Sequence, residues 1–209
     1  MNNIIVGIDE VGRGCWAGPL VAAAVILPSK PFWEDCPPKA PKGGATVLRD
    51  SKRLSKKQRE RLDVQIRSQA VAYGVGWVTP DEVDAMGLTK SVQLAMLRAV
   101  KKLHQSGVSY DKIIIDGNIN YFSHVQGLRT QNIAAVVRAD DTYPAVSAAS
   151  IVAKVARDNY MAEMAAQYPG YSFEKHVGYG TAAHIAALKE HGVTDMHRKS
   201  FAPVRAFAL

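Results

Sequence analysis

The sequence predicts an α/β fold, in which buried strands are covered by helices. The segments LVAAAVIL (20–27), KIII (112–115) and IAAVV (133–137) are continuous apolar runs, which are typical of strands buried on both faces of a sheet. Between these runs, apolar residues recur at helical spacing. A chain of 209 residues can bury a substantial core, and no internal repeat or linker divides it. We therefore expect a single domain over residues 1–209, with a helical C-terminal portion at about 170–209.

The N-terminal part predicts two strands joined by a glycine-rich turn. Residues 3–11 read as the first strand and residues 20–27 as the second, with three glycines between them. Residues 28–46 contain five prolines and two glycines, too many for a regular element. We expect this segment to be a surface loop.

The central part predicts three helices around a strand. The segment Ser55–Gln58 is a capping box, in which the serine and glutamine side chains bond each other's backbone amides. Residues 71–78 alternate like a strand, and Thr79-Pro80 then opens a short helix with proline at its first position. A longer helix is expected from about Thr89. The helices after Ser55 and Thr89 carry apolar residues at helical spacing: Leu62, Ile66 and Ala70 in the first, and Val92, Met96, Val100 and Leu103 in the second.

The C-terminal half predicts two more strands followed by helices. The strands at 112–115 and 133–137 each run into acidic residues. A long alanine-rich helix is expected at 145–167, ended by a Pro-Gly pair. The last helix, 182–191, has Thr181 as its N-cap and Gly192 just past its end.

The composition favours a polyanionic partner. The chain has 26 Lys and Arg against 19 Asp and Glu, a formal net charge of +7. Basic side chains that neutralise phosphates release counterions, so such a charge favours nucleic-acid binding. Cys15 and Cys36 lack the spacing of metal ligands and are expected to be free thiols. No signal peptide or membrane-spanning run is evident, so we expect a cytoplasmic protein. We also expect it to be a monomer.

Three apolar strands end in acidic residues: Asp9-Glu10, Asp116 and Asp140-Asp141. Asp is common in turns, which explains any one of these residues alone. In open α/β sheets, however, the functional crevice lies outside the carboxyl ends of strands. Two carboxylates about 4 Å apart repel by roughly 4 kcal/mol at an effective dielectric of 20, and cations can neutralise such a cluster. Oxygen ligands of this kind suit Mg²⁺ or Mn²⁺.

The double acid at Asp9-Glu10 raises a geometric difficulty. Consecutive strand residues point to opposite faces, so both side chains cannot aim into one site from a regular strand. We therefore expect the strand to bend or end at this point, which Gly12 and Gly14 would permit.

An alternative interpretation is a dinucleotide-binding loop. The segment from Gly12 to Ala17, GRGCWA, matches the loose pattern G-x-G-x-x-G/A after a strand. That motif requires a helix to begin at the loop, so that its N-terminus faces the pyrophosphate. Here Gly18-Pro19 follows, and then a segment that reads as a strand. The dinucleotide interpretation is therefore disfavoured but remains an alternative.

Seven blocks of the sequence carry a family resemblance: GIDEVGRG (7–14), AGP (17–19), DSKRLS (50–55), IIIDGN (113–118), AASIVAKVARD (148–158), GYGT (178–181) and HRKSFAPV (197–204). In this order they resemble ribonuclease HII, the prokaryotic type 2 ribonuclease H. The resemblance implies a ribonuclease H-like fold with a mixed five-stranded sheet flanked by helices. It also implies a metal-dependent endonuclease that cleaves the RNA strand of RNA/DNA hybrids and nicks 5′ of single ribonucleotides in duplex DNA, in replication and repair. A hybrid-binding protein without catalysis is the other alternative, which the retained acids argue against.

The resemblance also assigns roles to residues. The four metal-binding acids of the family correspond to Asp9, Glu10, Asp116 and Asp140, which would hold two divalent cations, Mg²⁺ or Mn²⁺. The family usually has Lys-Gly-Asp-Ser where this chain has Arg138-Ala139-Asp140-Asp141, which aligns Asp140 with the acid and Asp141 with the serine. With such a site, water is expected to attack the phosphorus and to leave a 5′-phosphate and a 3′-hydroxyl.

Other residues are implied to bind the nucleic acid. The backbone of Gly12-Arg13-Gly14 would read the ribose 2′-OH, the group that distinguishes RNA from DNA. Ser51 and Lys52 would contact the phosphate backbone, and Tyr179 would stack at the RNA–DNA junction. His197, Arg198 and Lys199 would extend this basic track, whereas the other histidines are assigned no function.

Overall fold

A mixed five-stranded sheet forms the centre of the protein. The structure is a computed structural model that describes residues 3–29, 54–123, 125–128 and 132–207. Its strands are β1 (Ile5–Val11), β2 (Leu20–Ile26), β3 (Ala72–Val78), β4 (Lys112–Asp116) and β5 (Ile133–Val136), in the order β3-β2-β1-β4-β5. β1 and β3 pair with β2 in antiparallel fashion, and β1, β4 and β5 are parallel. The predicted sheet is confirmed.

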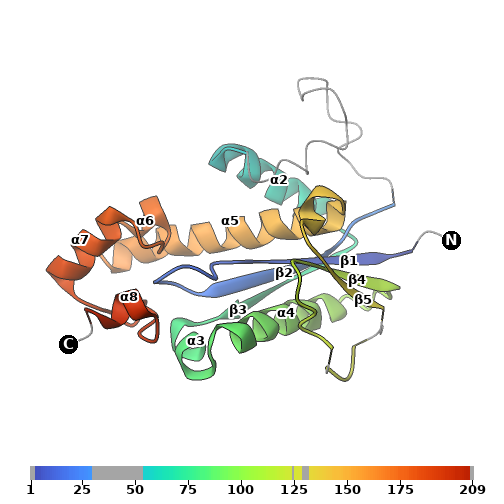
Figure 1. The fold of residues 1–209 in the computed structure, drawn as a ribbon. Helices are drawn as coiled ribbons and strands as arrows, with labels where there is room; N and C mark the ends of the chain where they lie inside the picture. The colour runs from blue at the N-terminus through green and yellow to red at the C-terminus, as the bar shows by residue number, and fades with distance from the viewer. Residues whose placement is uncertain (1–2, 30–53, 124, 129–131, 208–209) are drawn as a thin grey trace.

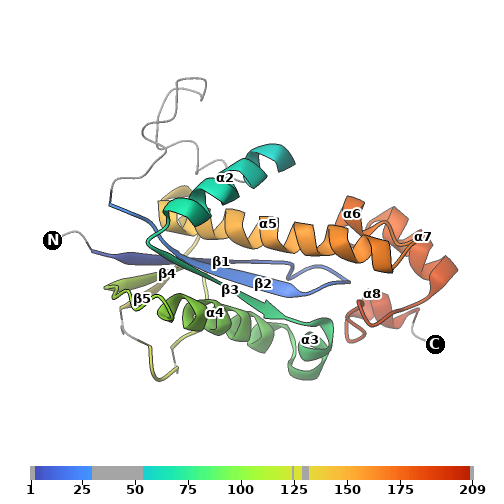
Figure 2. The ribbon, with the colours of Figure 1, turned by 180° about the vertical axis from the view of Figure 1, so that it is seen from behind.

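Helices cover both faces of this sheet, as Figures 1 and 2 show. α2 (Lys56–Gln69) and α5 (Pro144–Gln167) lie on one face, and α3 (Pro80–Met86) and α4 (Leu88–His104) lie on the other. β2 is buried along its whole length because its alternate residues pack into opposite layers, Ala22 and Ala24 towards α4 and Ala23 and Val25 towards α5. This burial on two faces explains its uninterrupted apolar sequence.

Glycines allow α4 to pack closely on β3. A Cβ at Gly74 would lie 2.1 Å from the carbonyl oxygen of Ala99, and one at Gly76 would lie 2.0 Å from that of Ala95. Any side chain would therefore displace the helix backbone from the sheet. The predicted capping box of Ser55 with Gln58 is present, and Thr79 forms a second one with Glu82.

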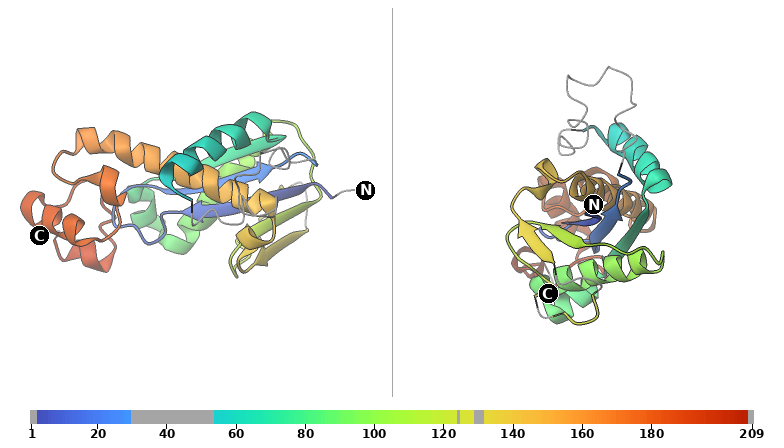
Figure 3. Two further views of the ribbon diagram at one scale, coloured as in Figure 1. Left: turned by 90° about the horizontal axis from the view of Figure 1, so that it is seen from above. Right: turned by 90° about the vertical axis from the view of Figure 1, so that its right-hand side faces the viewer.

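The C-terminal helices lie beyond one end of the sheet (Figure 3, left). They are α6 (Phe173–His176), α7 (Ala182–His191) and α8 (Ala202–Arg205). Earlier in the chain, a short 3-10 helix, η3 (Ala139–Asp141), precedes α5. Met161 of α5, Phe173 and Leu188 form part of an apolar cluster that joins this portion to the long helix. Within the described ranges, no helix is both long and apolar enough to cross a membrane.

Candidate active site

Three of the four predicted acids lie at one edge of the sheet. Asp9 and Glu10 lie near the end of β1, and Asp116 is the last residue of β4. The pairing of these parallel strands ends at Ile8 and Ile115, so Asp9 and Asp116 follow at the same level. All three acids line a pocket of about 400 Å³.

The expected bend of the strand at Asp9-Glu10 is wrong. β1 continues to Val11, which pairs with Val21 of β2. Beyond Ile8, however, β1 has no pairing with β4, so its edge on that side is open. An open edge gives the Glu10 side chain a way to reach the pocket that Asp9 also lines. The end of strand pairing therefore brings both carboxylates to one site without a break in the strand.

Burial and mutual repulsion disfavour the charge on Asp9. Burial and the neighbouring charges of Glu10 and Asp116 raise the pKa of Asp9 from 3.8 to about 8, although a hydrogen bond with Ser150 opposes the shift. The Oδ1 atom of Asp9 accepts a hydrogen bond from the backbone N–H of Glu10 at 2.8 Å. At neutral pH the site thus favours a proton or a cation beside Asp9.

Only one of the two carboxylate oxygens of Glu10 has a hydrogen-bond partner. Its Oε1 accepts a hydrogen bond from Arg13 Nη1 at 3.1 Å, whereas its Oε2 is buried with no hydrogen-bond partner. Burial raises the pKa of Glu10, and the attraction of Arg13 opposes this rise. A buried carboxylate oxygen without a donor is costly, and a cation bound in the pocket would satisfy it.

Asp140 and Asp141 differ in their surroundings. Asp140 is only 2% exposed, whereas Asp141 pairs with Arg138 at 2.6 Å on the surface. The N–H of Ala139 donates to Oδ1 of Asp116 at 2.7 Å, which brings this turn to the end of β4. Asp140 is not among the residues that line the pocket. Arg138, and not Ala139, has a left-handed backbone conformation (φ 57°). Position 139 therefore does not require the glycine that the family usually has there.

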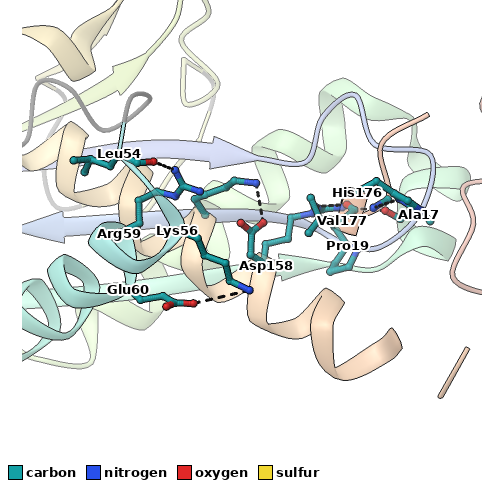
Figure 4. Close-up of polar contacts among 12 residues, drawn as sticks. Ala17, Pro19, Leu54, Lys56, Arg59, Glu60, Asp158, His176 and Val177 are labelled. Carbon is teal, nitrogen blue, oxygen red and sulfur yellow. Dashed lines mark hydrogen bonds and ion pairs between the residues drawn. The ribbon is translucent and has the colours of Figure 1, made fainter. Parts of the chain in front are cut away.

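The pocket also contains residues to which sequence analysis assigned no function. Arg59 of α2 and both Ser150 and Lys154 of α5 line it. Arg59 donates to the Leu54 carbonyl (Figure 4). Lys154 Nζ lies 2.8 Å from Asp158 Oδ1. The spacing of Ser150 and Lys154, four residues apart on a helix that covers β1, is the signal that would have identified them.

The glycine-rich loop leads into a strand and not into a helix. β2 begins at Leu20, so the dinucleotide motif lacks the helix N-terminus that it requires. Gly12 has φ of 90°, and a Cβ there would lie 2.5 Å from Arg157 Nε. A Cβ at Gly14 would meet nothing within 4 Å. Gly12 is therefore needed by the fold, whereas Gly14 leaves open space beside the loop.

Two buried arginines hold this loop. Arg157 donates to the carbonyls of Pro19 at 2.8 Å, Ala17 at 2.9 Å and Val177 at 2.8 Å, and so joins the loop to the segment before Tyr179. Arg198 donates to the carbonyls of Arg13 and Gly18 at 3.0 Å. Burial lowers the pKa of Arg198 to about 10. The sequence did not reveal these roles, because the carbonyls lie about 140 and 180 residues away along the chain.

The predicted basic track at 197–199 is wrong for two of its residues. His197 and Arg198 are fully buried and bond to protein groups, so neither presents a surface to nucleic acid. Lys199 is exposed. Tyr179 is 41% exposed and lines the acidic pocket. The described residues do not include Ser51, Lys52, Cys36 or most of the proline-rich segment. Cys15 is described and is a buried free thiol, as expected.

The donor set fits a hard divalent cation. The potential oxygen ligands that line the pocket are three carboxylates and the hydroxyls of Ser150 and Tyr179, and one carboxylate oxygen there lacks a partner. Over the described ranges, no group of three or more His, Cys, Asp or Glu side chains is already arranged to hold one ion.

Comparison with known proteins gives the family. The family model described as Ribonuclease HII matches residues 6–204. A ribonuclease HII of Janthinobacterium sp. (strain Marseille) is 42% identical over 205 residues, covering 98% of this chain and 87% of the relative.

Solved structures share the fold. The ribonuclease H2 of Pyrococcus horikoshii OT3 superposes with a TM-score of 0.77 at 24% identity, covering 97% of this chain and 96% of the other. Bst-RNase HIII in complex with Mn²⁺ gives 0.74 at 20% identity, covering 99% of this chain and 69% of the other. The ribonuclease H-like fold is thus confirmed. The chain belongs to the ribonuclease HII family and is, like its relatives, an endonuclease that degrades the RNA of RNA/DNA hybrids.

Proposed function

We propose that the enzyme nicks 5′ of single ribonucleotides in duplex DNA, as well as cleaving hybrids, and that two divalent cations, Mg²⁺ or Mn²⁺, are held by Asp9, Glu10, Asp116 and Asp140. The observation that carries the metal assignment is the convergence of Asp9, Glu10 and Asp116 on one pocket, with Glu10 Oε2 unsatisfied. Asp140 is added because it is buried in the turn whose Ala139 N–H bonds Asp116. The structure of Bst-RNase HIII with Mn²⁺ supports a divalent cation on this fold.

The residues of the pocket are assigned different roles in the reaction. When bound, the cations supply Lewis-acid stabilisation of the attacking and leaving oxygens and lower the pKa of a bound water. Asp9 experiences the charges of both Glu10 and Asp116 and is assigned as the shared ligand. Arg59 and Lys154 line the same pocket and are assigned to the scissile and adjacent phosphates. In-line attack by water leaves a 5′-phosphate and a 3′-hydroxyl, so the 2′-OH serves recognition only.

Substrate recognition is assigned to two loops and the segment before α2. The Gly12-Arg13-Gly14 backbone reads the 2′-OH, and the open space at Gly14 supports this assignment. Tyr179 stacks on the nucleotide at the junction, which its exposed ring beside the pocket supports. Ser51 and Lys52 contact the phosphate backbone.

Cleavage of an end-labelled duplex with one ribonucleotide tests the proposed function. We expect a single nick 5′ of the ribonucleotide in Mg²⁺ or Mn²⁺ and none in chelator. A nick on the 3′ side, or none on this duplex while continuous hybrid is cut, would contradict the nicking assignment.

The fourth ligand is tested by the two adjacent aspartates. Asp140→Asn should lower kcat on hybrid substrate by roughly 10²-fold or more, because it removes charge from the buried acid proposed to bind metal. Asp141→Ser should change it little, since it removes only an exposed ion pair with Arg138. Steady-state rates of the two purified variants decide the matter, and the reverse ranking would place the ligand at Asp141.

Tyr179 is tested by removal of its ring. Base–aromatic stacking contributes about 1–3 kcal/mol per base, so Tyr179→Ala should weaken nicking at a single ribonucleotide by roughly tenfold or more. Cleavage within a continuous RNA strand should fall no further, because only the single ribonucleotide always presents an RNA–DNA junction. Rates on the two duplexes measure this, and selective loss of hybrid cleavage would exclude the junction role.

A further inference from the structure

Three buried histidines lie beneath the turn that carries Tyr179. They are His176 of α6, His184 of α7 and His197, which follows α7. The rings of His176 and His184 stack at 4.6 Å between centroids, and those of His184 and His197 lie 5.2 Å apart. Neither the metal chemistry nor the reading of the ribose uses these side chains, yet buried imidazoles must be hydrogen-bonded to be tolerated.

The hydrogen bonds fix the tautomer of each ring. The backbone N–H of Thr194 donates to His197 Nδ1 at 3.0 Å, so neutral His197 carries its proton on Nε2. That proton faces His184 Nε2 at 3.1 Å, which must therefore be an acceptor. His184 then carries its proton on Nδ1 and donates it to the Tyr179 carbonyl at 3.0 Å. One chain of directed hydrogen bonds thus runs from Thr194 to Tyr179.

His176 holds the other side of the same turn. The N–H of Gly178 donates to His176 Nδ1 at 3.2 Å, so His176 donates from Nε2 to the Tyr171 carbonyl at 2.8 Å. The turn itself is strained, because Val177, a β-branched residue, has φ of 43°. Such a conformation persists only when the surrounding contacts over-determine it.

We propose that His184 is a positioning residue for Tyr179: held in one tautomer by His197, it fixes the Tyr179 carbonyl and so the orientation of the exposed ring towards the junction nucleotide. This inference rests on the stacking role proposed above for Tyr179. The carbonyl also accepts from the N–H of Thr181 at 2.8 Å, so the two donors together set its direction. Loss of the imidazole would leave the Tyr179 carbonyl with the Thr181 N–H as its remaining donor, and so with one directional constraint where there are now two.

The electrostatic surroundings favour the neutral rings that this arrangement requires. Burial and the neighbouring imidazoles lower the pKa of His197 to about 4 and lower that of His184 as well. The groups around them are His176 on α6, the Tyr171 ring beside His197, and Asp195, whose charge opposes the shift of His197. Protonation of His184 at Nε2 would place two N–H groups against each other across the 3.1 Å contact. Protonation of His197 at Nδ1 would place its new N–H against that of Thr194.

Nitrogen-15 NMR of histidine side chains in the whole protein tests the chain of hydrogen bonds without any substrate. At pH 7 we expect His184 to be neutral with its proton on Nδ1, and His176 and His197 to be neutral with theirs on Nε2. Single histidine variants assign the signals. A protonated His184, or one with its proton on Nε2, would overturn the proposal whatever Tyr179 does.

Two substitutions of His184 separate positioning from packing. Asparagine places its amide nitrogen where Nδ1 lies and keeps the donor to Tyr179, whereas glutamine reaches only the Nε2 position. We expect His184→Gln to lower kcat/KM for the single-ribonucleotide duplex roughly tenfold, as for a lost buried hydrogen bond, and His184→Asn to lower it much less. His191→Gln, on the same helix without contact to Tyr179, is the control.

The same variants are compared in a Tyr179→Ala background. There we expect His184→Gln to cause no further loss, because the ring that it positions is gone. Equal losses for His184→Gln and His184→Asn, or an undiminished loss in the Tyr179→Ala background, would show that His184 only packs. If Tyr179→Ala alone does not slow nicking, the stacking role fails, while the NMR result still decides the hydrogen-bond chain.

Discussion

Replacing Asp9 with asparagine should abolish cleavage while stabilising the metal-free protein. A Lewis acid contributes several kcal/mol of transition-state stabilisation, so loss of its proposed shared ligand should lower kcat by roughly 10³-fold or more. Removal of the cations with EDTA should have the same effect and be reversed by adding Mg²⁺ or Mn²⁺.

The stabilisation follows from the pKa of Asp9. Since folding raises that pKa from 3.8 to about 8, the protonated form contributes stability that is fully present below 3.8 and is lost as pH rises through about 8. Asparagine is neutral at every pH, so the free energy of unfolding of the variant should exceed that of the wild type by several kcal/mol at alkaline pH, with an upper bound of about 6 kcal/mol from the pKa shift. The difference should shrink as the pH falls towards 4.

Activity and thermal unfolding in chelator, across pH, measure both effects. Asp81→Asn is a matched control, because Asp81 is an exposed aspartate in the first turn of α3 and is not among the pocket residues. Full activity of Asp9→Asn, or of the wild type in chelator, would refute the metal assignment. A variant less stable than the wild type at pH 8 would refute the account of the buried charge.

Duplex DNA without any ribonucleotide should not be cut detectably. If the Gly12–Gly14 backbone bonds the 2′-OH, a substrate without that hydroxyl leaves buried polar groups unpaired, and a site of this kind can reject the analogue by roughly 10⁴-fold or more. One embedded ribonucleotide should be sufficient for cleavage.

Gly14 allows this reading to be tested within the protein. A Cβ at Gly14 meets nothing within 4 Å, so Gly14→Ala should fold normally yet prevent close approach of the ribose. Gly12→Ala would instead disturb Arg157 and the fold itself. We expect Gly14→Ala to lose at least tenfold in kcat/KM on the single-ribonucleotide duplex with little change in its thermal unfolding.

Parallel rates on all-DNA, single-ribonucleotide and continuous-hybrid duplexes measure the discrimination. Comparable cutting of the all-DNA duplex would exclude recognition of the 2′-OH. Unchanged rates for Gly14→Ala would show that the 2′-OH is recognised by another part of the protein.

The sequence by itself determined the elements of the fold and the edge of the sheet where the acids lie. Helix caps such as Ser55 and Thr79, and runs such as LVAAAVIL, depend on neighbours a few residues apart, so local patterns predict them. The acids follow the ends of parallel strands, and parallel strands present their carboxyl ends at one edge.

Only the tertiary structure decided which side chains share the pocket and which are buried. No local sequence pattern indicates that the pairing of β1 with β4 stops at Ile8. Because the pairing stops there, the edge of β1 is open beside Glu10, which lines the pocket with Asp9. Nor does it show that Arg198 points into the protein towards the Gly18 carbonyl, 180 residues away. Sequence patterns predict that a charged side chain is exposed. Its burial depends on hydrogen-bond acceptors that only the folded chain brings to it.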